Sequence, residues 1–413
     1  MANLPTQPTD LAEVPDGVRP NYTPALASLA VLYFMMGFIT CLNDTLVPFF
    51  KKGFNLNYAQ SSLVQFYFFL TYGIMSIPAG KIVERLGYKT GMVLGFAVAA
   101  LGAVLFYPAS ALHQYALFLA ALFVIAIGIV LLQVAANPYI TILGPAQTAS
   151  ARLTLIQGVG SVGTTVAPLF GAVFILAPLA SASSDAIRYP YLGIAALLAT
   201  IALVLGRLRL PVLKAGANSE ALPDSARNRV FSFRNLRLGV WGIFCYVGAE
   251  VAIGTFLTNY IADTLSISEK EANPLVAFYW GSMLIGRFAG AFLLKSVKAS
   301  TMLSVCAVLA ITLVTVSIAA TGYVAVWTMI AVGLCNSVMF AILFSLSVQG
   351  LGRLTDRASG WLATAITGGA VVPFGQGLLI DRFSWPVAFL LPIACYVYIL
   401  FYGLNGYKTT VRS

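Results

Sequence analysis

Two acidic residues stand in stretches of the chain that are otherwise apolar. Asp44 lies within the apolar run 25–50, and Glu250 lies within the apolar run 237–261. Each run is long enough to cross a bilayer as a helix, which takes roughly 20 residues. A carboxylate in the hydrocarbon core costs about 2.5 kcal/mol or more, so such residues usually face a protein interior or a water-filled cavity. The two acids therefore predict a path for ions or polar solutes.

The neighbours of Asp44 leave the nature of the ion open. Asp44 and Glu250 could each exchange a proton and couple transport to it. An ionised Asp44 beside Asn43 and Thr45 could instead hold Na⁺, because hard cations take oxygen ligands. Either acid could also be structural, Asp44 in a packing network and Glu250 as the partner of a backbone or Arg group. The sequence predicts no other metal site and no cofactor.

The composition requires an integral membrane protein. Of the 413 residues, 59% are hydrophobic and only 9% are charged, whereas soluble domains carry about 25% charged residues. The apolar runs are long, which favours helices over the short alternating strands of a β-barrel. The net charge of +10 is explained below by topology, and we expect no nucleic-acid partner.

The chain divides into twelve apolar segments, six on each side of a polar stretch. We predict an N-terminal tail over 1–24, a six-helix bundle over 25–210, a linker over 211–236, a second bundle over 237–406 and a tail over 407–413. The predicted spans are 25–50, 58–80, 90–108, 112–142, 152–176, 189–210, 237–261, 273–295, 298–320, 324–350, 357–381 and 385–406.

The distribution of basic residues predicts the orientation. With both termini and the linker inside, Arg287 lies within a span, and most of the 24 Lys and Arg residues are on the inner side. This asymmetry fits the positive-inside rule. The exceptions in outer loops are Lys51, Lys52, Arg188, Lys270 and Arg382.

The two halves also repeat each other. The letters LVQFY at 63–67 in the second span match LVAFY at 275–279 in the eighth. Such parallel repeats are typical of transporters that rock two halves around a site near the membrane midplane. A second match has identical spacings in the fifth and eleventh spans: Arg152, Gly163 and Pro168 match Arg357, Gly368 and Pro373.

The loop between the second and third spans, GKIVERLGYKT at 80–90, resembles the signature loop of the major facilitator superfamily. It departs from that pattern by having Glu84 where Asp is usual. Its charged residues could pair with neighbouring helix ends and hold an inner gate shut. The predicted gate residues are Gly80, Glu84, Arg85, Gly87, Lys89, Arg152, Arg287 and Arg357.

Further motifs are similar to those of the fucose–galactose–glucose:proton symporter family. They are LND at 42–44, NPYITILGP at 137–145, YVGAEVAIG at 246–254, and NSVMF at 336–340 with Phe344 and Ser345. The resemblance covers nearly the whole chain. It implies twelve transmembrane helices in two pseudo-symmetric bundles and sugar uptake coupled to a cation.

The resemblance implies roles for single residues. Asn43 would bind sugar and Asp44 would take the proton. Gln133 stands where the fucose permease has a second essential acid, and Gln cannot titrate. Gln157 matches a sugar-binding Gln, but the Asn three residues later is Gly160 here. These departures favour glucose, galactose or N-acetylglucosamine over fucose.

Sugar recognition needs amides for hydroxyl groups and flat aromatic rings for the apolar ring faces. Each candidate could instead pack between helices. The candidates in the predicted spans are Asn43, Gln65, Tyr67, Gln133, Asn137 and Gln157 in the first half, and Asn259, Tyr279, Trp280, Asn336 and Trp361 in the second.

We therefore predict a sugar–cation symporter that works by alternating access, with protons favoured over Na⁺. A passive facilitator and a drug–proton antiporter are the alternatives among transporters. No nucleophile–base pair or metal cluster in the sequence supports an enzyme. We expect a monomer in a bacterial inner membrane whose partners are a small sugar, H⁺ or Na⁺, and lipid.

Overall fold

The computed structural model describes residues 23–54, 58–171, 174, 187–208 and 230–409. The side chains of residues 43–53 and 58–66, within α1 and α2, lie outside this description. Most of the predicted N-terminal tail and of the predicted linker also lies outside it. The described chain is helical, and the predicted all-α fold is confirmed.

Long helices follow the predicted apolar segments closely. In the first half they are α1 (Thr23–Gly53), α2 (Tyr58–Leu86), α3 (Tyr88–Ala111), α4 (Tyr115–Ile142), α5 (Ala149–Gly171) and α7 (Arg188–Arg207). In the second half they are α9 (Arg234–Leu265), α10 (Glu269–Leu293), α11 (Ala299–Ala319), α12 (Gly322–Val348), α13 (Thr355–Thr364), α14 (Gly368–Arg382) and α15 (Trp385–Phe401). Single turns are η1 (Ala146–Thr148), η4 (Val230–Ser232), η5 (Gly352–Leu354), η6 (Ala365–Thr367) and η7 (Tyr402–Gly406).

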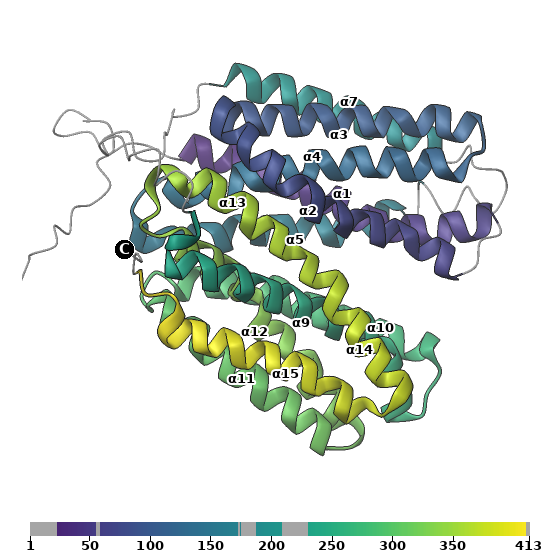
Figure 1. Cartoon of the computed structure of the whole chain (residues 1–413). Coiled ribbons are helices and arrows are strands. Elements are labelled where there is room, and N and C mark those ends of the chain that lie inside the picture. The colour runs from purple at the N-terminus through teal and green to yellow at the C-terminus, as the bar shows by residue number, and fades with distance from the viewer. Residues whose placement is uncertain (1–22, 55–57, 172–173, 175–186, 209–229, 410–413) are drawn as a thin grey trace, which may run out of the picture.

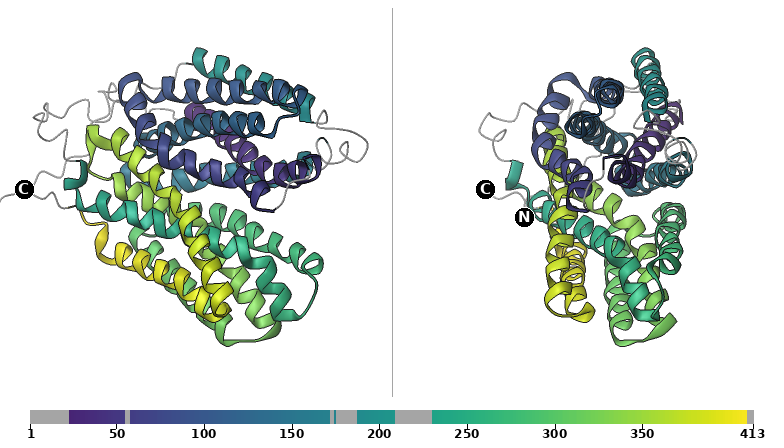
Figure 2. Two further views of the ribbon diagram at one scale, coloured as in Figure 1. Left: turned by 45° about the vertical axis from the view of Figure 1, so that its right-hand side comes forward. Right: turned by 90° about the vertical axis from the view of Figure 1, so that its right-hand side faces the viewer.

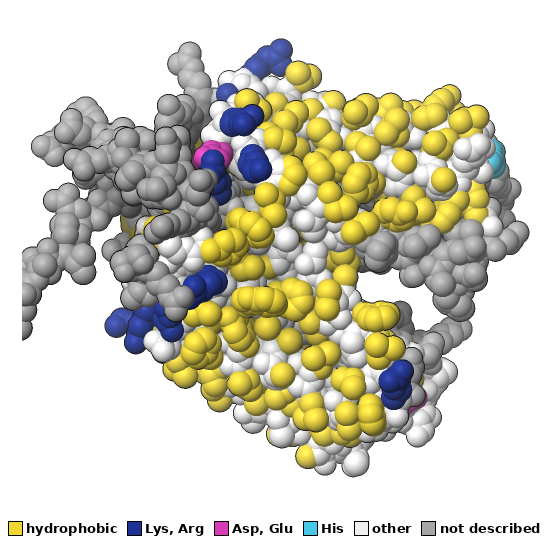
Figure 3. Space-filling view, viewed as in Figure 1, with side chains coloured by type: hydrophobic (Ala, Val, Ile, Leu, Met, Phe, Trp, Pro, Cys, Tyr) yellow, Lys and Arg dark blue, Asp and Glu magenta, His cyan; other side chains and the backbone are white. Residues whose placement is uncertain are grey.

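These helices span a membrane. Ten stretches of the described chain are long and apolar enough to cross one. The helices α2 and α5 add 29 and 23 residues, which at roughly 1.5 Å per residue also exceed a 30 Å hydrocarbon core. Figure 3 shows apolar side chains over the middle of the molecule and most of the visible Lys and Arg near the end where the C-terminus lies. The protein is therefore a multi-pass membrane protein.

The helices form two groups that meet along one seam. In the first half α1 packs on α5, and α3 packs on α4 and α7; in the second, α9 packs on α12, α14 and α15. Figures 1 and 2 show the groups as two bundles. Across the seam, α2 contacts α13, and α5 contacts α10 and α12. These contacts gather toward the end where α7 finishes and α9 starts, which we call the linker end.

The internal repeat is visible in the helix packing. A methyl group at Gly163 on α5 would collide with the backbone carbonyl of Phe34 on α1. At the matching position of the second half, a methyl group at Gly368 on α14 would collide with the carbonyl of Phe244 on α9. Each half therefore needs a glycine at the same place so that its two central helices can approach closely.

The eleventh span lies where the sequence predicts it, since the stretch Thr355–Ile380 is long and apolar enough to cross a membrane. Its helix is not regular, because a 3₁₀ turn, η6, separates α13 from α14. Gly368 follows this turn at the tight contact with α9, and Pro373 lies within α14. A short 3₁₀ stretch inside a helix often marks a hinge.

The turn between α9 and α10 sets the register of the two helices that carry Glu250 and Arg287. Ser266 ends α9 in the left-handed region at φ 53°. Ser268 then caps α10: its hydroxyl accepts from the Glu271 amide at 3.3 Å, and the Glu271 carboxylate accepts from the Ser268 amide at 3.1 Å. Such a capping box satisfies two free amides at a helix start.

We predict that Gly368→Ala destabilises the protein, because its methyl group meets a backbone atom that cannot move aside. Overpacking of this kind costs about 1–3 kcal/mol. Gly193→Ala on α7 is the matched control, because a methyl group there meets nothing within 4 Å. Thermal unfolding in detergent should show a lower Tm for Gly368→Ala only. An equal Tm for both variants would contradict the tight contact.

Candidate functional site

A cavity of about 230 Å³ lies between the two halves. Both halves contribute to its wall, through α1, α4 and α5 on one side and α9, α10, α12 and η6 on the other. Its lining residues are Tyr33, Met36, Gly37, Thr40, Gln133, Asn137, Gln157, Gly160, Thr164, Tyr246, Val247, Glu250, Arg287, Phe340 and Ile366.

The first half supplies a wall of amides. Gln133, Asn137 and Gln157 all line the cavity, as the sequence predicts for a sugar site. The Asn137 carboxamide oxygen accepts a hydrogen bond from the Tyr33 hydroxyl, and Gln133 is hydrogen-bonded to Tyr72. These partners hold the two amides in place while their remaining donors and acceptors can serve a polar ligand.

The second half supplies two opposite charges. Glu250 lies halfway along α9, and its carboxylate is 3.9 Å from the Arg287 guanidinium on α10. The two side chains are 13% and 20% exposed. Arg287 also donates to the Ser161 hydroxyl on α5, so it crosses the seam. The sequence predicts a gate or structural role for Arg287, and the structure places it in the cavity beside the acid Glu250.

Two predicted sugar ligands of the second half instead belong to a packing network. Tyr279 and Asn336 are fully buried, and Asn336 donates to the Tyr279 hydroxyl at 3.0 Å. The Asn336 oxygen accepts from Tyr396 at 2.9 Å, and the Tyr279 hydroxyl donates to the Glu250 carbonyl at 3.2 Å. The network supports the backbone of Glu250 from behind the cavity wall.

The remaining aromatic and amide candidates whose side chains are described do not line the cavity either. Trp280 is 48% exposed, and Trp361 packs edge-on against Phe231 near the linker end. Tyr67 is half-buried on α2, and Asn259 is exposed near the end of α9. The side chains of Asn43, Asp44 and Gln65 lie outside the described residues.

The sequence reasoning missed several lining residues. Tyr33, Thr40 and Tyr246 line the cavity but were not among the candidates, and neither was Ser161, which accepts a hydrogen bond from Arg287. Helical spacing offered one signal, because Tyr246 precedes Glu250 by one turn on α9, and the two side chains are hydrogen-bonded. Among the described residues, no group of three His, Cys, Asp or Glu could hold a metal ion.

An ion pair joins the halves at the linker end. The Arg357 guanidinium on α13 donates to the Glu84 carboxylate on α2 at 2.6 Å. Glycines let the two helices approach: a methyl group at Gly360 would lie 2.8 Å from the Ser76 carbonyl oxygen and 3.4 Å from the Gly80 Cα atom. Glu84 and Gly80 on α2 and Arg357 on α13 therefore belong to the same contact between the two helices.

Hydroxyl groups extend this closed contact. The Ser150 and Ser345 hydroxyls of α5 and α12 are 2.5 Å apart, and the Ser359 hydroxyl donates to the Val134 carbonyl on α4 at 2.9 Å. At the linker end the halves therefore touch in two places, where α13 meets α2 and α4 and where α5 meets α12.

Four further predicted gate residues, Arg85, Gly87, Lys89 and Arg152, belong to the first half. Arg152 donates to the Thr141 and Pro145 carbonyls at 2.9 and 2.8 Å and so fixes the turn after α4. Lys89 donates to the Gly206 carbonyl at the end of α7 at 2.7 Å. Gly87 joins α2 to α3 at φ +84°, and Arg85 is exposed.

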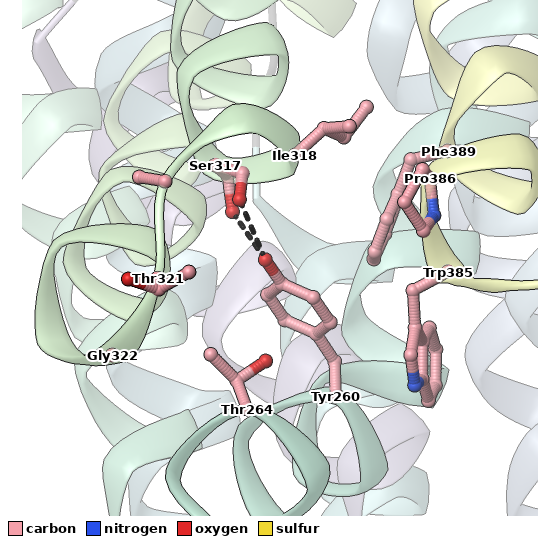
Figure 4. Close-up of a pocket in the computed structure, with 10 residues that line it drawn as sticks. Tyr260, Thr264, Ser317, Ile318, Thr321, Gly322, Trp385, Pro386 and Phe389 are labelled. Atoms are coloured by element: carbon pink, nitrogen blue, oxygen red, sulfur yellow. Dashed lines mark hydrogen bonds between the residues drawn. The ribbon is translucent and has the colours of Figure 1, made fainter.

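A second cavity, of about 250 Å³, lies among α9, α11, α12 and α15 of the second half (Figure 4). It is lined by Tyr260, Trp385 and Phe389 and by residues around the turn from α11 to α12. The Tyr260 hydroxyl is already bonded to Ser317, at 3.0 Å from its carbonyl and 2.8 Å from its hydroxyl. This cavity lacks the paired charges and amides of the first one.

Comparison with known proteins agrees with this architecture. The family model of the Major Facilitator Superfamily matches residues 29–372. The glucose/galactose transporter of Brucella abortus biovar 1 (strain 9-941) is 48% identical over 395 residues, which cover 94% of this chain and 95% of that protein. The L-fucose-proton symporter of Escherichia coli (strain K12) is 32% identical over 430 residues, 97% of each chain.

A solved structure gives the same result. The crystal structure of the transporter FucP in the outward conformation matches with a TM-score of 0.85 at 30% identity, covering 93% of this chain and 99% of that chain. These relatives are transporters, in agreement with the prediction of a transporter rather than an enzyme. The chain belongs to the Major Facilitator Superfamily and, within it, to the fucose–galactose–glucose:proton symporter family.

Proposed function

We propose that this protein carries a neutral hexose, such as glucose or galactose, across the membrane together with a cation. The observation that supports this most directly is the lining of the cavity between the halves. Gln133, Asn137 and Gln157 offer both donors and acceptors. The charges of Glu250 and Arg287 cancel, so the described wall favours a neutral polyol over a sugar acid. The named substrates of the relatives, glucose/galactose and fucose, are of this class.

Two acids are proposed for coupling, one in each half. Glu250 lies in the described cavity. The backbone of α1 passes through residues 43 and 44 one turn beyond Thr40, which lines the cavity. We propose that Asp44 loads a proton and Asn43 binds sugar, as the family resemblance implies. Na⁺ held by Asp44, Asn43 and Thr45 is the alternative.

The proposed transport cycle alternates access to this cavity. The contacts at the linker end close that side, and the likeness to an outward-facing structure supports the assignment of the linker end to the cytoplasm. Sugar and cation then enter from outside, the halves rock, and the Glu84–Arg357 pair opens to release both ligands inward. We propose a monomer in the bacterial inner membrane, with both termini cytoplasmic.

Purified protein in liposomes tests this function. We expect uptake of labelled glucose or galactose to be driven by an inward proton gradient and abolished by a protonophore. N-acetylglucosamine and fucose serve as competing substrates, and a sodium gradient is imposed separately. Uptake driven only by sodium would select the sodium alternative, whereas uptake that equilibrates without any gradient would indicate a passive facilitator.

Replacing the first acid tests the coupling. Asp44→Asn should abolish gradient-driven accumulation but retain counterflow exchange, because the sugar site survives while the titratable group is lost. Asp263→Asn is the control, since Asp263 is exposed near the end of α9 and bonds Trp385. Intact accumulation in Asp44→Asn would remove Asp44 from the mechanism.

Truncating an amide tests the sugar site. Gln133→Ala should weaken glucose binding by roughly tenfold, the effect of losing one or two hydrogen bonds. Calorimetry on the purified protein measures this, with Gln349→Ala as a control because Gln349 is exposed after α12. An unchanged affinity in Gln133→Ala would place this residue outside the binding site.

Breaking the ion pair tests the gate. The pair is about one-third exposed, so its loss should cost about 1 kcal/mol or less and raise the population of the open linker end by about two- to fivefold. The readout is the alkylation rate of Ser345→Cys with and without Arg357→Gln. Arg85→Gln is the exposed control, and equal rates in all three would mean that the pair does not hold the gate.

A further inference from the structure

Arg287 stands between acceptors that belong to opposite halves. Arg287 belongs to α10, and one of its terminal nitrogens is 3.9 Å from a carboxylate oxygen of Glu250 on α9. The other terminal nitrogen donates to Ser161 on α5. The Ser161 hydroxyl itself donates to the Gln157 carbonyl at 3.1 Å, so it is fixed as an acceptor for Arg287.

The guanidinium is not fully satisfied by these partners. It carries five N–H donors in a planar fork, and its Nε lies buried without an acceptor among the described residues. A well-formed Arg–carboxylate pair has N···O distances of about 2.7–2.9 Å, well below the 3.9 Å found here. A buried cation with unused donors is costly, so this group favours a ligand that brings acceptor oxygens.

We propose that Arg287 binds the sugar directly and that the charge on Glu250 controls whether it can do so. This inference rests on the proposed function, because it assigns the sugar and the proton to the same cavity. The hydroxyl oxygens of a hexose are neutral acceptors of the kind that the guanidinium lacks. Arg287 thereby couples the binding of the sugar to the binding of the proton.

The sign of the linkage follows from the charges. An ionised Glu250 competes with the sugar for the guanidinium. When Glu250 takes a proton, the ion pair is lost, and Arg287 is left with Ser161 and the sugar as neutral acceptors. Sugar therefore binds more tightly to the protonated carrier, and by reciprocity sugar favours proton binding. A symporter needs this sign, because its two ligands must favour the same state.

The surroundings of Glu250 contain few other groups that could produce this dependence. Arg287 and Tyr279 face it from α10, and Tyr246 faces it from its own helix. The cavity wall opposite adds the Tyr33 hydroxyl from α1, while Phe340 on α12 and Ile366 in η6 do not titrate. The Asp44 side chain lies outside the described residues, so the test must separate the two acids.

Calorimetric titration of the purified full-length protein with D-glucose and D-galactose, between pH 5.5 and 8.5, tests the proposal. Wild-type affinity should fall as pH rises. Glu250→Gln should keep the low-pH affinity across the range, because its neutral amide cannot compete as an anion. Arg287→Gln should bind about tenfold more weakly at low pH and lose the dependence that Glu250 causes. Arg287→Lys should fall between wild type and Arg287→Gln and serves as the charge-preserving variant if Arg287→Gln does not fold.

Two matched controls separate the proposal from a general effect. Lys295→Gln removes an exposed cation just beyond α10 and should keep the wild-type pH profile. Comparing Asp44→Asn with Asp44→Asn/Glu250→Gln separates the two acids, because the pH dependence that Glu250 causes should be lost only in the double variant. The proposal is overturned if Arg287→Gln and Arg287→Lys bind sugar as the wild type does, or if Glu250→Gln retains the wild-type pH profile. Failure of the wild type to bind any tested sugar would instead refute the proposed function.

Discussion

A charge buried within a membrane must keep a partner, and this constraint organises the protein. Isolated Arg or Asp at the centre of a membrane helix costs about 2.5–3.5 kcal/mol even on the more lenient scales. Glu250 and Arg287 avoid this cost because α9 and α10 lie side by side. The two side chains therefore face the same cavity and lie close to each other. The amides of α4 and α5 then complete the polar wall of this cavity. The two-bundle fold is the arrangement that hides this cavity while leaving a seam through which it can open.

The strength of the contacts differs between the bundles and the seam. Within each half, a glycine brings two central helices into backbone contact, at Gly163 in one and Gly368 in the other. Across the seam, α2 packs closely on α13 at Gly80 and Gly360, and the polar contacts are a partly exposed ion pair and a few hydroxyl bonds. Exposed ion pairs contribute little net stability. These polar contacts can therefore break at small cost while each bundle stays intact, as rigid-body rocking requires.

The sequence allowed the fold and part of the site to be predicted, but not which way each polar side chain faces. Hydropathy located the spans, and the family resemblance identified Gln133 and Gln157 in the cavity wall. The 3₁₀ turn η6 within the eleventh span could not be read from hydropathy, because glycines and a proline fit both an interrupted and a continuous helix. A polar residue in an apolar helix can face a ligand or another helix, and only tertiary packing decides. Asn336 and Tyr279 bond each other, whereas Arg287 enters the cavity.

The repeated halves have diverged in function at matching positions. Arg152 and Arg357 hold the same place in the repeat, yet Arg152 fixes a turn of its own half while Arg357 reaches across to Glu84. The cavity is asymmetric in the same way, with amides from the first half and paired charges from the second. A symmetric site would place like charges opposite each other, and two buried like charges repel. Dividing the wall into a neutral hydrogen-bonding side and a charge-compensated side removes that repulsion. A sugar bound between these two sides contacts both halves, so the contacts between the halves depend on whether the cavity is occupied. Ligand binding can therefore control which end of the seam is closed.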